Sequence, residues 1–223
     1  MDRSPPNPAP RGPWQRELRE GATALGVPLG ARALALFGRY LWELGRWQAR
    51  GNLTGFRTSQ AIVVGGFLDS ISCLKALPQR PMRIVDIGSG AGFPGLPLRI
   101  VRPDLALTLV EANRRRHSFL AHLCRHLGLL DVRCLHGRAE ILARGPGLGS
   151  TFDAAFARAV RQLPMAASLA REFLCAGGIF IGQQPAAAAQ KPPHVEGYST
   201  CSVILVPRRN GPAQALLVYG RAL

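Results

Sequence analysis

The chain contains 223 residues, and its 28 lysines and arginines against 13 acidic residues give a formal net charge of +15. This length fits one globular domain with a small addition and allows folding without disulfides. The composition excludes collagen, coiled coil and wholesale disorder. Such a positive charge favours a polyanionic partner, nucleic acid before a membrane surface. Because GC-rich genomes also enrich arginine, alanine, glycine and proline together, the charge alone does not establish that partner.

Cysteine usage and the N-terminus indicate the compartment. The five cysteines are scattered, and none forms a Cys-x-x-Cys pair. We therefore expect no disulfide framework, no zinc site and a cytoplasmic, reducing environment. Residues 1–13 are proline-rich, lack the apolar run of a signal peptide and are predicted to be disordered. No apolar run approaches the about 20 residues of a membrane span, so we expect no membrane partner.

Residues 14–78 are predicted to form a small helical cap. Apolar residues recur at helical spacing between Leu34 and Trp47, while most arginines fall off this stripe. After a turn at Gly51, a further helix is expected over 59–77, with Ser59 as its N-cap.

Residues 79–223 are predicted to alternate strands with helices. Helices are expected at 96–101, 113–127 and 163–175, with glycines ending the last two. Strands are expected at 82–87, 105–110, 132–135, 152–157, 179–181, 201–206 and 215–219. This order predicts an α/β fold with a mostly parallel seven-stranded sheet covered on both faces, to which a final hairpin adds one antiparallel strand.

The first of these strands ends in a glycine-rich segment, residues 86–95, which reads Asp-Ile-Gly-Ser-Gly-Ala-Gly-Phe-Pro-Gly. Ligands of open α/β sheets bind beyond such strand ends. The spacing of the glycines in this segment fits a binding site for either a dinucleotide or S-adenosylmethionine. Asp86 is a poor neighbour for phosphate, and Pro94 and Pro97 lack N–H groups at the helix start. A carboxylate suits the cationic amino and sulfonium groups of S-adenosylmethionine, so we expect this cofactor to contact Asp86, Gly88, Ser89, Gly90 and Gly92.

Later strand ends add to the expected pocket. Glu111 lies about twenty residues beyond the glycines, where an acid can accept hydrogen bonds from both ribose hydroxyls. The Ala139 amide could bond an adenine ring nitrogen and Glu140 the exocyclic amine, although Glu140 reads equally well as an acid that starts a helix. Arg158 ends the fourth strand and could hold an RNA phosphate or base, or be one of many arginines.

The chain lacks the catalytic motifs that methyltransferases use for several other kinds of methyl acceptor. The chain has Phe156-Ala157-Arg158-Ala159 where amine methyltransferases carry Asn/Asp-Pro-Pro-Tyr/Phe, and no cysteine follows a proline. His122 and His126 form an i, i+4 pair, but without further ligands they are predicted to be solvated, and no metal site is expected. Guanine N7 fits such a site because its lone pair is free at neutral pH and only alignment is required. Other weakly assisted acceptors also fit.

From about Leu41 to the C-terminus, the chain resembles the bacterial 16S ribosomal RNA guanine-N7 methyltransferase G family, also called the glucose-inhibited division protein B family. The motifs that carry the resemblance are Asn52-Leu53-Thr54, Leu68-Asp69-Ser70, the glycine-rich segment with its Gly-Phe-Pro-Gly extension, Arg102-Pro103-Asp104, Glu111 and Arg158-Ala159. The resemblance implies a class I, Rossmann-like methyltransferase fold. It also implies S-adenosylmethionine as donor and small-subunit ribosomal RNA, in the 30S subunit or an assembly intermediate, as acceptor. We expect a monomer.

Matched motif by motif, the resemblance implies cofactor contacts at Gly88, Phe93, Ala139, Glu140 and Arg158. It gives Glu111 the ribose-binding place and sets Asn52 at the border of the pocket.

The chain departs from the family pattern at two places. Gly65 and Gly66 stand where the family usually has Arg-His, and Gln183 and Gln184 stand where it has Lys-Gly. Both changes remove side chains that could contact RNA but leave the cofactor residues intact. The alternatives are therefore a non-catalytic RNA-binding or ribosome-assembly protein that keeps a cofactor pocket, a methyltransferase for another acceptor and, last, a nicotinamide-dependent oxidoreductase.

Overall fold

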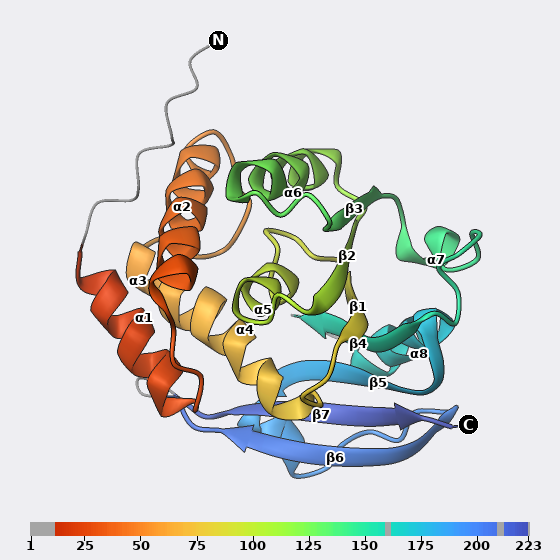
Figure 1. Cartoon of the computed structure of the whole chain (residues 1–223). Helices are drawn as coiled ribbons and strands as arrows, with labels where there is room; N and C mark the ends of the chain where they lie inside the picture. Colours follow the sequence, from red (N-terminus) through yellow and green to blue (C-terminus); the bar gives the residue numbers. More distant parts are fainter. Residues whose placement is uncertain (1–11, 159–161, 209–211, 223) are drawn as a thin grey trace.

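The computed structural model describes residues 12–158, 162–208 and 212–222. Its strands are β1 (Met82–Ile87), β2 (Leu105–Glu111), β3 (Arg133–His136), β4 (Phe152–Arg158), β5 (Leu174–Pro185), β6 (Tyr198–Val206) and β7 (Gln214–Arg221). They form one sheet in the order β3-β2-β1-β4-β5-β7-β6 (Figure 1). β1 to β5 are parallel, and β7 runs antiparallel to both β5 and β6. This arrangement confirms the predicted sheet with its terminal hairpin.

The helices fall into an N-terminal group and a group interleaved with the strands. The N-terminal group contains α1 (Pro13–Ala24), α2 (Ala31–Gln48) and a continuous helical segment made of α3 (Ser59–Ala61), the π-helical η1 (Ile62–Leu68), α4 (Asp69–Ser72) and the 3-10 turn η2 (Cys73–Ala76). The interleaved group contains α5 (Gly95–Val101), α6 (Arg114–Leu127), α7 (Ala139–Leu142), α8 (Leu163–Phe173) and the 3-10 turn η3 (Ala186–Ala189).

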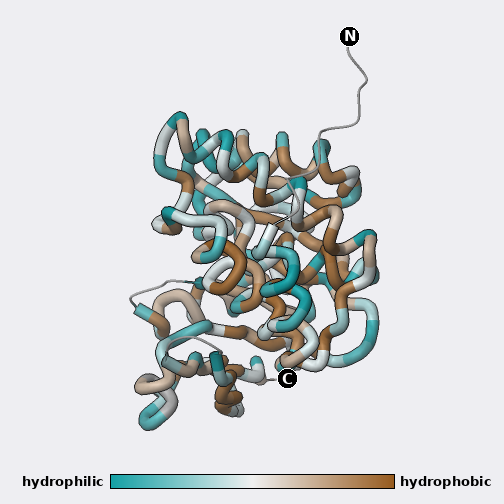
Figure 2. The backbone as a smooth tube through the Cα atoms, turned by 90° about the vertical axis from the view of Figure 1, so that its left-hand side faces the viewer, coloured by the Kyte–Doolittle hydropathy of each residue, from teal (hydrophilic) through white to brown (hydrophobic). Residues whose placement is uncertain are grey.

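The sheet separates two hydrophobic clusters. α5, α6 and the N-terminal helices cover one face, and α7 and α8 cover the other (Figure 1). Within β1, Ile84 belongs to the first cluster and Val85 to the second, as the two-residue period of a strand requires. Figure 2 shows hydrophobic segments concentrated inside the molecule and hydrophilic ones mostly at its periphery.

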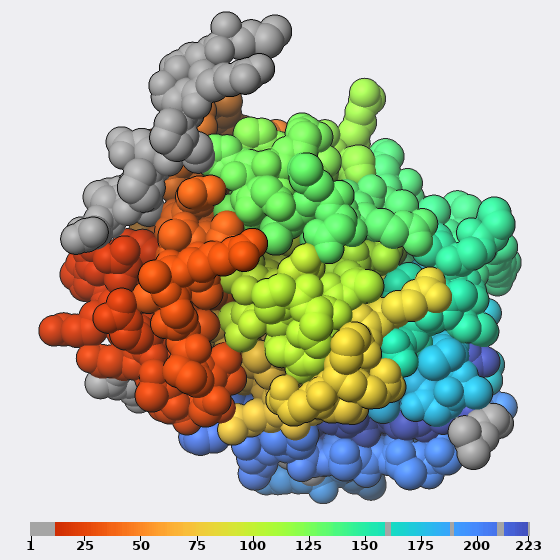
Figure 3. All heavy atoms as spheres, in the orientation of Figure 1, coloured from red at the N-terminus to blue at the C-terminus, as the bar shows by residue number. Residues whose placement is uncertain are grey.

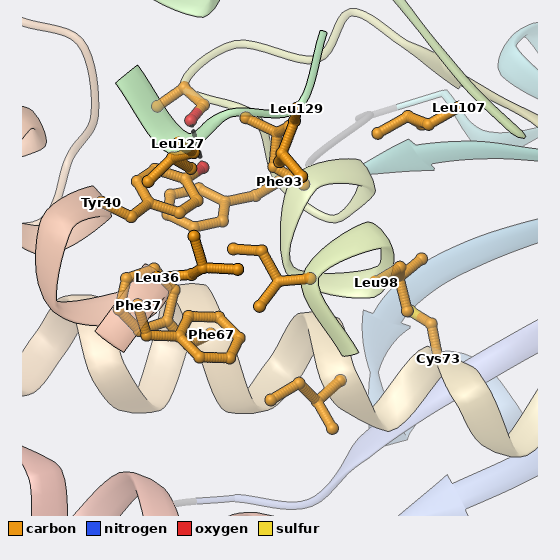
Figure 4. Packing of buried hydrophobic residues seen from close by; sticks show 14 of the residues in the cluster. Leu36, Phe37, Tyr40, Phe67, Cys73, Phe93, Leu98, Leu107, Leu127 and Leu129 are labelled. Carbon is orange, nitrogen blue, oxygen red and sulfur yellow. Dashed lines mark hydrogen bonds between the residues drawn. The ribbon is translucent and has the colours of Figure 1, made fainter. Parts of the chain in front are cut away.

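The N-terminal helices share the first cluster with the glycine-rich loop. Tyr40 of α2 stacks on Phe93, with ring centroids 5.6 Å apart, and Phe67 of η1 lies 6.0 Å from Phe93 (Figure 4). The Tyr40 hydroxyl donates to the Ala91 carbonyl at 2.5 Å. Burial of one such side chain stabilises the fold by about 1.5–3 kcal/mol. In the space-filling view, the N-terminal helices and α5 and α6 form one continuous surface (Figure 3).

Two details of the N-terminal helices differ from the prediction: the first residue of α1 and the N-cap of the segment at 59–76. α1 begins at Pro13, where a proline fits because the first helical N–H has no acceptor. Thr58, rather than Ser59, is the N-cap of the segment at 59–76, since its side chain accepts from the Ala61 N–H at 3.1 Å. The predicted disordered tail, residues 1–13, lies outside the described residues over 1–11.

The boundary between α8 and β5 corrects the sequence prediction. α8 ends at Phe173, because Leu174 already pairs with Phe152 of β4. Gly177 and Gly178 therefore lie within a long strand instead of ending a helix. A Cβ atom at Gly178 would come 2.9 Å from the Cys175 carbonyl oxygen. A residue without a side chain is therefore needed where the backbone approaches itself at the bulge in this strand.

Over the described residues, no helix combines the length and the apolar character that crossing a lipid bilayer requires.

Candidate functional site

The loop after β1 depends on glycine for its shape. Gly88, Gly90 and Gly92 have φ values of 69°, 59° and 96°, in the left-handed region that favours glycine. Gly92 has a second constraint, because a Cβ atom there would lie 2.6 Å from the Tyr40 hydroxyl. The predicted cofactor residue Ser89 is buried and its hydroxyl donates to the Asp86 carbonyl at 2.8 Å. The Ser89 hydrogen bond therefore ties the loop back to the end of β1.

Asp86 lies beneath this loop, fully buried. Its Oδ2 accepts the Gly95 N–H at 2.9 Å, while its Oδ1 has no hydrogen-bond partner among the described residues. Burial raises the pKa of the Asp86 carboxyl to about 7, although the hydrogen bond from Gly95 and the charge of Arg158 lower it. In this conformation, Asp86 ties β1 to the start of α5 and does not line the pocket described next.

A pocket of about 470 Å³ opens beyond the carboxyl ends of β1, β2, β3 and β4. This volume lies within the about 300–1,000 Å³ of ligand sites. The pocket brings together four predicted cofactor residues: Gly88, Glu111, Ala139 and Glu140. Side chains of α8, including Met165 and Leu169, form part of its apolar lining and were not predicted as site residues. Only the register of α8 against the sheet, which the sequence does not specify, could have identified them.

Glu111 joins the pocket to the glycine-rich loop. Its side chain is oriented by two backbone groups, because Oε2 accepts the Gly90 N–H at 2.8 Å and Oε1 accepts the Asn113 N–H at 2.7 Å. Each carboxylate oxygen can still accept a further hydrogen bond. The residue is only 5% exposed and lines the pocket, so it presents a positioned acceptor to a ligand there.

Ala139 and Glu140 begin α7 and also line the pocket. The first N–H groups of a helix have no acceptor within it, so the Ala139 amide is suited to a ligand atom. Glu140 is exposed. Its place in the first turn of α7 also agrees with the simpler interpretation of an acid that favours a helix start.

Arg158 lies at the junction between β4 and the N-terminal helices and does not line the 470 Å³ pocket. Its Nη2 donates to the Gly65 carbonyl oxygen and lies 3.7 Å from an Asp69 carboxylate oxygen. The guanidinium also lies over the rings of Phe56 and Phe93, 5.9 and 5.7 Å from their centroids. Its Nη1 is buried without a hydrogen-bond partner among the described residues.

Asp69, which the sequence places only within the Leu68-Asp69-Ser70 motif, lies at the centre of a charged cluster. Arg208 donates to both Asp69 carboxylate oxygens, with Nε at 2.9 Å from Oδ1, and the Gln183 side chain donates to the Asp69 carbonyl at 2.5 Å. Burial raises the pKa of Asp69, although Arg208 and Arg158 lower it. Asp69 and Arg208 also line a second cavity, of about 570 Å³, between α1, the η1–α4 segment and the end of β6.

The two glycines that depart from the family pattern make room for aromatic rings. A Cβ atom at Gly65 would lie 2.7 Å from the Phe56 ring, and one at Gly66 would lie 2.9 Å from the Phe93 ring. Both lie in the π-helical η1, and Arg158 uses the Gly65 carbonyl. The small residues therefore allow Phe56, Phe93 and Arg158 to pack together at this junction.

Asn52 lies in the loop that follows α2 and is exposed. Its side-chain oxygen accepts from Arg57 Nη1 at 3.2 Å. The loop itself is held by Gln48, whose side-chain oxygen accepts the Leu53 and Thr54 N–H groups at 3.0 and 3.1 Å. Asn52 is not part of the 470 Å³ pocket, so its predicted place at the pocket border remains a prediction.

The sequence of this chain is similar to those of known proteins. A family model described as "GidB: rRNA small subunit methyltransferase G" matches residues 33–196. The ribosomal RNA small subunit methyltransferase G of Chloroflexus aggregans is 40% identical over 204 residues, which cover 88% of this chain and 86% of that protein. The protein of the same name from Geobacillus kaustophilus is 40% identical over 167 residues, or 74% of this chain and 70% of that protein.

Solved structures support the fold. A predicted O-methyltransferase from Agrobacterium tumefaciens superimposes with a TM-score of 0.53 at 15% identity, covering 66% of this chain and 76% of that one. M. jannaschii TYW2 in complex with AdoMet gives a TM-score of 0.52 at 16% identity, covering 70% and 77%. The predicted class I, Rossmann-like methyltransferase fold is confirmed, and the chain belongs to the rRNA small subunit methyltransferase G family.

Proposed function

We propose that this chain transfers the methyl group of S-adenosylmethionine to guanine N7 in small-subunit ribosomal RNA. The observation that carries the proposal is the convergence of Gly88, Glu111, Ala139 and Glu140 on one pocket at the carboxyl edge of the sheet. These residues come from three different strand ends, as expected for a ligand site in an open α/β sheet. Family membership supports both the donor and the class of RNA.

The pocket residues fit an adenosine-containing ligand. Glu111 has acceptor capacity left for ribose hydroxyls after binding Gly90 and Asn113. Ala139 offers a helix-starting N–H for a ring nitrogen, and the exposed Glu140 offers an acceptor for an exocyclic amine. Met165 and Leu169 supply apolar contact area for a flat ring. When bound, S-adenosylmethionine supplies an electrophilic methyl group on a sulfonium.

The chain's own part in the reaction is binding and alignment. A guanine N7 lone pair needs no base to become nucleophilic, so the protein has to hold that nitrogen in line with the methyl group and the sulfur. Glu111 and the start of α7 both line the pocket, and Arg158 packs over Phe93 of the neighbouring loop and over Phe56. Orientation of this kind can contribute much of a rate enhancement without a general base.

The RNA would approach a positively charged rim. Arg138 lines the pocket and is exposed, and Arg114 and Arg115 are exposed at the start of α6, which follows β2. Arginine binds phosphate through a planar fork and stacks on bases. We further propose that the chain acts as a monomer in the cytoplasm, where bacterial small subunits are made. Light scattering after size-exclusion chromatography tests the monomer.

The experiment for the proposed function is methyl transfer from labelled S-adenosylmethionine to 30S subunits that lack this modification, with the labelled nucleoside identified by mass spectrometry. We expect label in 7-methylguanosine. Label in another nucleoside contradicts the N7 assignment but keeps the enzyme. Bound cofactor and bound RNA without any labelled product contradict catalysis and support a binding protein.

A further inference from the structure

Three side chains outside the proposed active site converge where α2 and α6 lie side by side (Figure 1). His122 Nε2 lies 2.8 Å from Oε2 of Glu43, and His126 Nε2 lies 3.6 Å from Oε1 of the same carboxylate. In the part of the chain that the structure describes, one ligand atom from each residue lies within 4.8 Å of the other two. The pair that the sequence predicts to be solvated is only partly exposed, and both histidines face a carboxylate from another helix.

The burial of this cluster is unusual for charged groups. The Glu43 side chain is 1% exposed, and those of His122 and His126 are 36% and 20% exposed. Carboxylates are rarely fully buried unless they are paired or bind a metal. His126 Nε2 is buried and makes no hydrogen bond within the described residues, although it points at Glu43. The apo geometry thus leaves one nitrogen of the cluster without the partner that its position calls for.

The spacing suits a metal ion. His122 and His126 are four residues apart on α6, which places them on one helix face. Zinc bonds of about 2.0–2.2 Å place tetrahedral ligand atoms about 3.3 Å apart. The two carboxylate–imidazole distances, 2.8 and 3.6 Å, lie on either side of that value. The two distances end on different oxygens of Glu43, but one ligand atom of each residue lies within 4.8 Å of the other two, so a rotation of the carboxylate and small shifts of the imidazoles bring three ligands to one ion.

The surrounding charges oppose and limit such a site. Arg46 contacts Glu43 Oε1 at 3.0 Å, but its side chain is 53% exposed and can turn into solvent. Arg46 is therefore the cation that a metal ion displaces from Glu43.

We propose that Glu43, His122 and His126 form a binding site for a single zinc-class divalent cation, which clamps the N-terminal helix α2 to α6. The ligand set is one carboxylate oxygen and two imidazole nitrogens, with a fourth position left to water. Binding displaces Arg46 from Glu43. The site is separate from the proposed methyl-transfer pocket, so the proposal stands or falls independently of the proposed function.

The first test measures Zn²⁺ binding to the full chain, freed of metal by a chelator, by isothermal titration calorimetry. We expect one equivalent of Zn²⁺ to bind and thermal unfolding to shift upward by about 5–10 °C at a hundredfold excess over Kd. His126→Gln should weaken binding at least about tenfold. The control is His117→Gln, which changes another histidine of α6 whose Nε2 lies at the Cys134 carbonyl and not at Glu43.

A second variant separates a metal site from a simple hydrogen-bonded cluster. Arg46→Gln removes the cation that competes for Glu43, so it should tighten Zn²⁺ binding while leaving the three ligands in place. Failure of Zn²⁺ to bind, or stoichiometric binding that His126→Gln leaves unchanged, overturns the proposal. Equal weakening by His126→Gln and His117→Gln also overturns it, because the ion would then bind elsewhere on α6.

Discussion

The Glu111 carboxylate lies 2.8 Å from the Gly90 backbone nitrogen, so the end of β2 holds the loop that follows β1. The same side chain also lines the pocket. One residue thus shapes the glycine-rich loop and offers an acceptor to the ligand, and the first prediction separates these two roles.

Glu111→Gln should weaken S-adenosylmethionine binding by about tenfold or more, because an amide has one acceptor oxygen where the carboxylate has two. The variant should also lose about 1–3 kcal/mol in the free energy of unfolding, because the amide NH2 group cannot accept and one of the two backbone N–H groups loses its acceptor. Calorimetry of cofactor binding measures the first effect. Unchanged affinity would remove Glu111 from the ribose-binding role.

Asp86→Asn should change the pH dependence of stability. The folded-state pKa of Asp86 is about 7, well above the usual value near 4, so folding favours the protonated carboxyl. The native state then binds more protons than the unfolded state between about pH 4 and pH 7, and stability falls as pH rises through this window. Asparagine cannot ionise and can still accept from Gly95. The variant should therefore gain stability relative to wild type as pH rises, by an amount on the order of a few kcal/mol.

Urea unfolding of both proteins at several pH values between 4 and 8 measures this difference. A stability difference that stays constant over that range would show that Asp86 is ionised in the folded protein.

Arg158→Ala should impair both activity and folding. The sequence alone predicts that methyl transfer falls much more than folding stability. The structure predicts in addition that the free energy of unfolding falls by about 1–3 kcal/mol, because the Gly65 carbonyl loses its donor and Asp69 loses one of its two cations. Turnover should be compared under conditions where the variant is fully folded by circular dichroism. Unchanged turnover there would exclude Arg158 from positioning the substrate.

Gly92→Ala should cost more stability than Gly128→Ala. Both glycines have positive φ, which costs a side-chain-bearing residue about 1 kcal/mol. A Cβ at Gly128 meets nothing within 4 Å, whereas one at Gly92 would lie 2.6 Å from both the Tyr40 hydroxyl and a Leu96 methyl group. Equal urea midpoints for the two variants would show that the contact between Tyr40 and the loop relaxes easily.

Local patterns predicted the elements better than the directions of the side chains. A short, mostly apolar run predicted β1, and Gly128 predicted the end of α6, whose N-cap in the structure is Asn113. The end of α8 was misplaced because tertiary pairing of Leu174 with Phe152 outweighed local helical preference. Such pairing depends on residues distant in the chain and is not visible in a local window.

The site residues also divide into those that local patterns predict and those that depend on contacts between distant parts of the chain. Gly88 and Glu111 could be predicted as site residues because strand ends are local features, and both line the pocket; their contact with the cofactor stays a prediction. The burial of Asp86 beneath the loop could not be predicted, since it depends on how α5 folds back over β1. Glu43 likewise has no signal that relates it to His122 and His126, because the three meet only when α2 packs on α6.

The stacking of Tyr40 on Phe93 has a consequence for dissecting this protein. A fragment that begins at the first strand would leave the loop after β1 without the aromatic surface and the hydroxyl that hold it. It would also expose Phe93, Leu98 and their neighbours to water. We therefore expect the sheet without α2 to aggregate, so that methyl-donor binding has to be studied with the N-terminal helices attached.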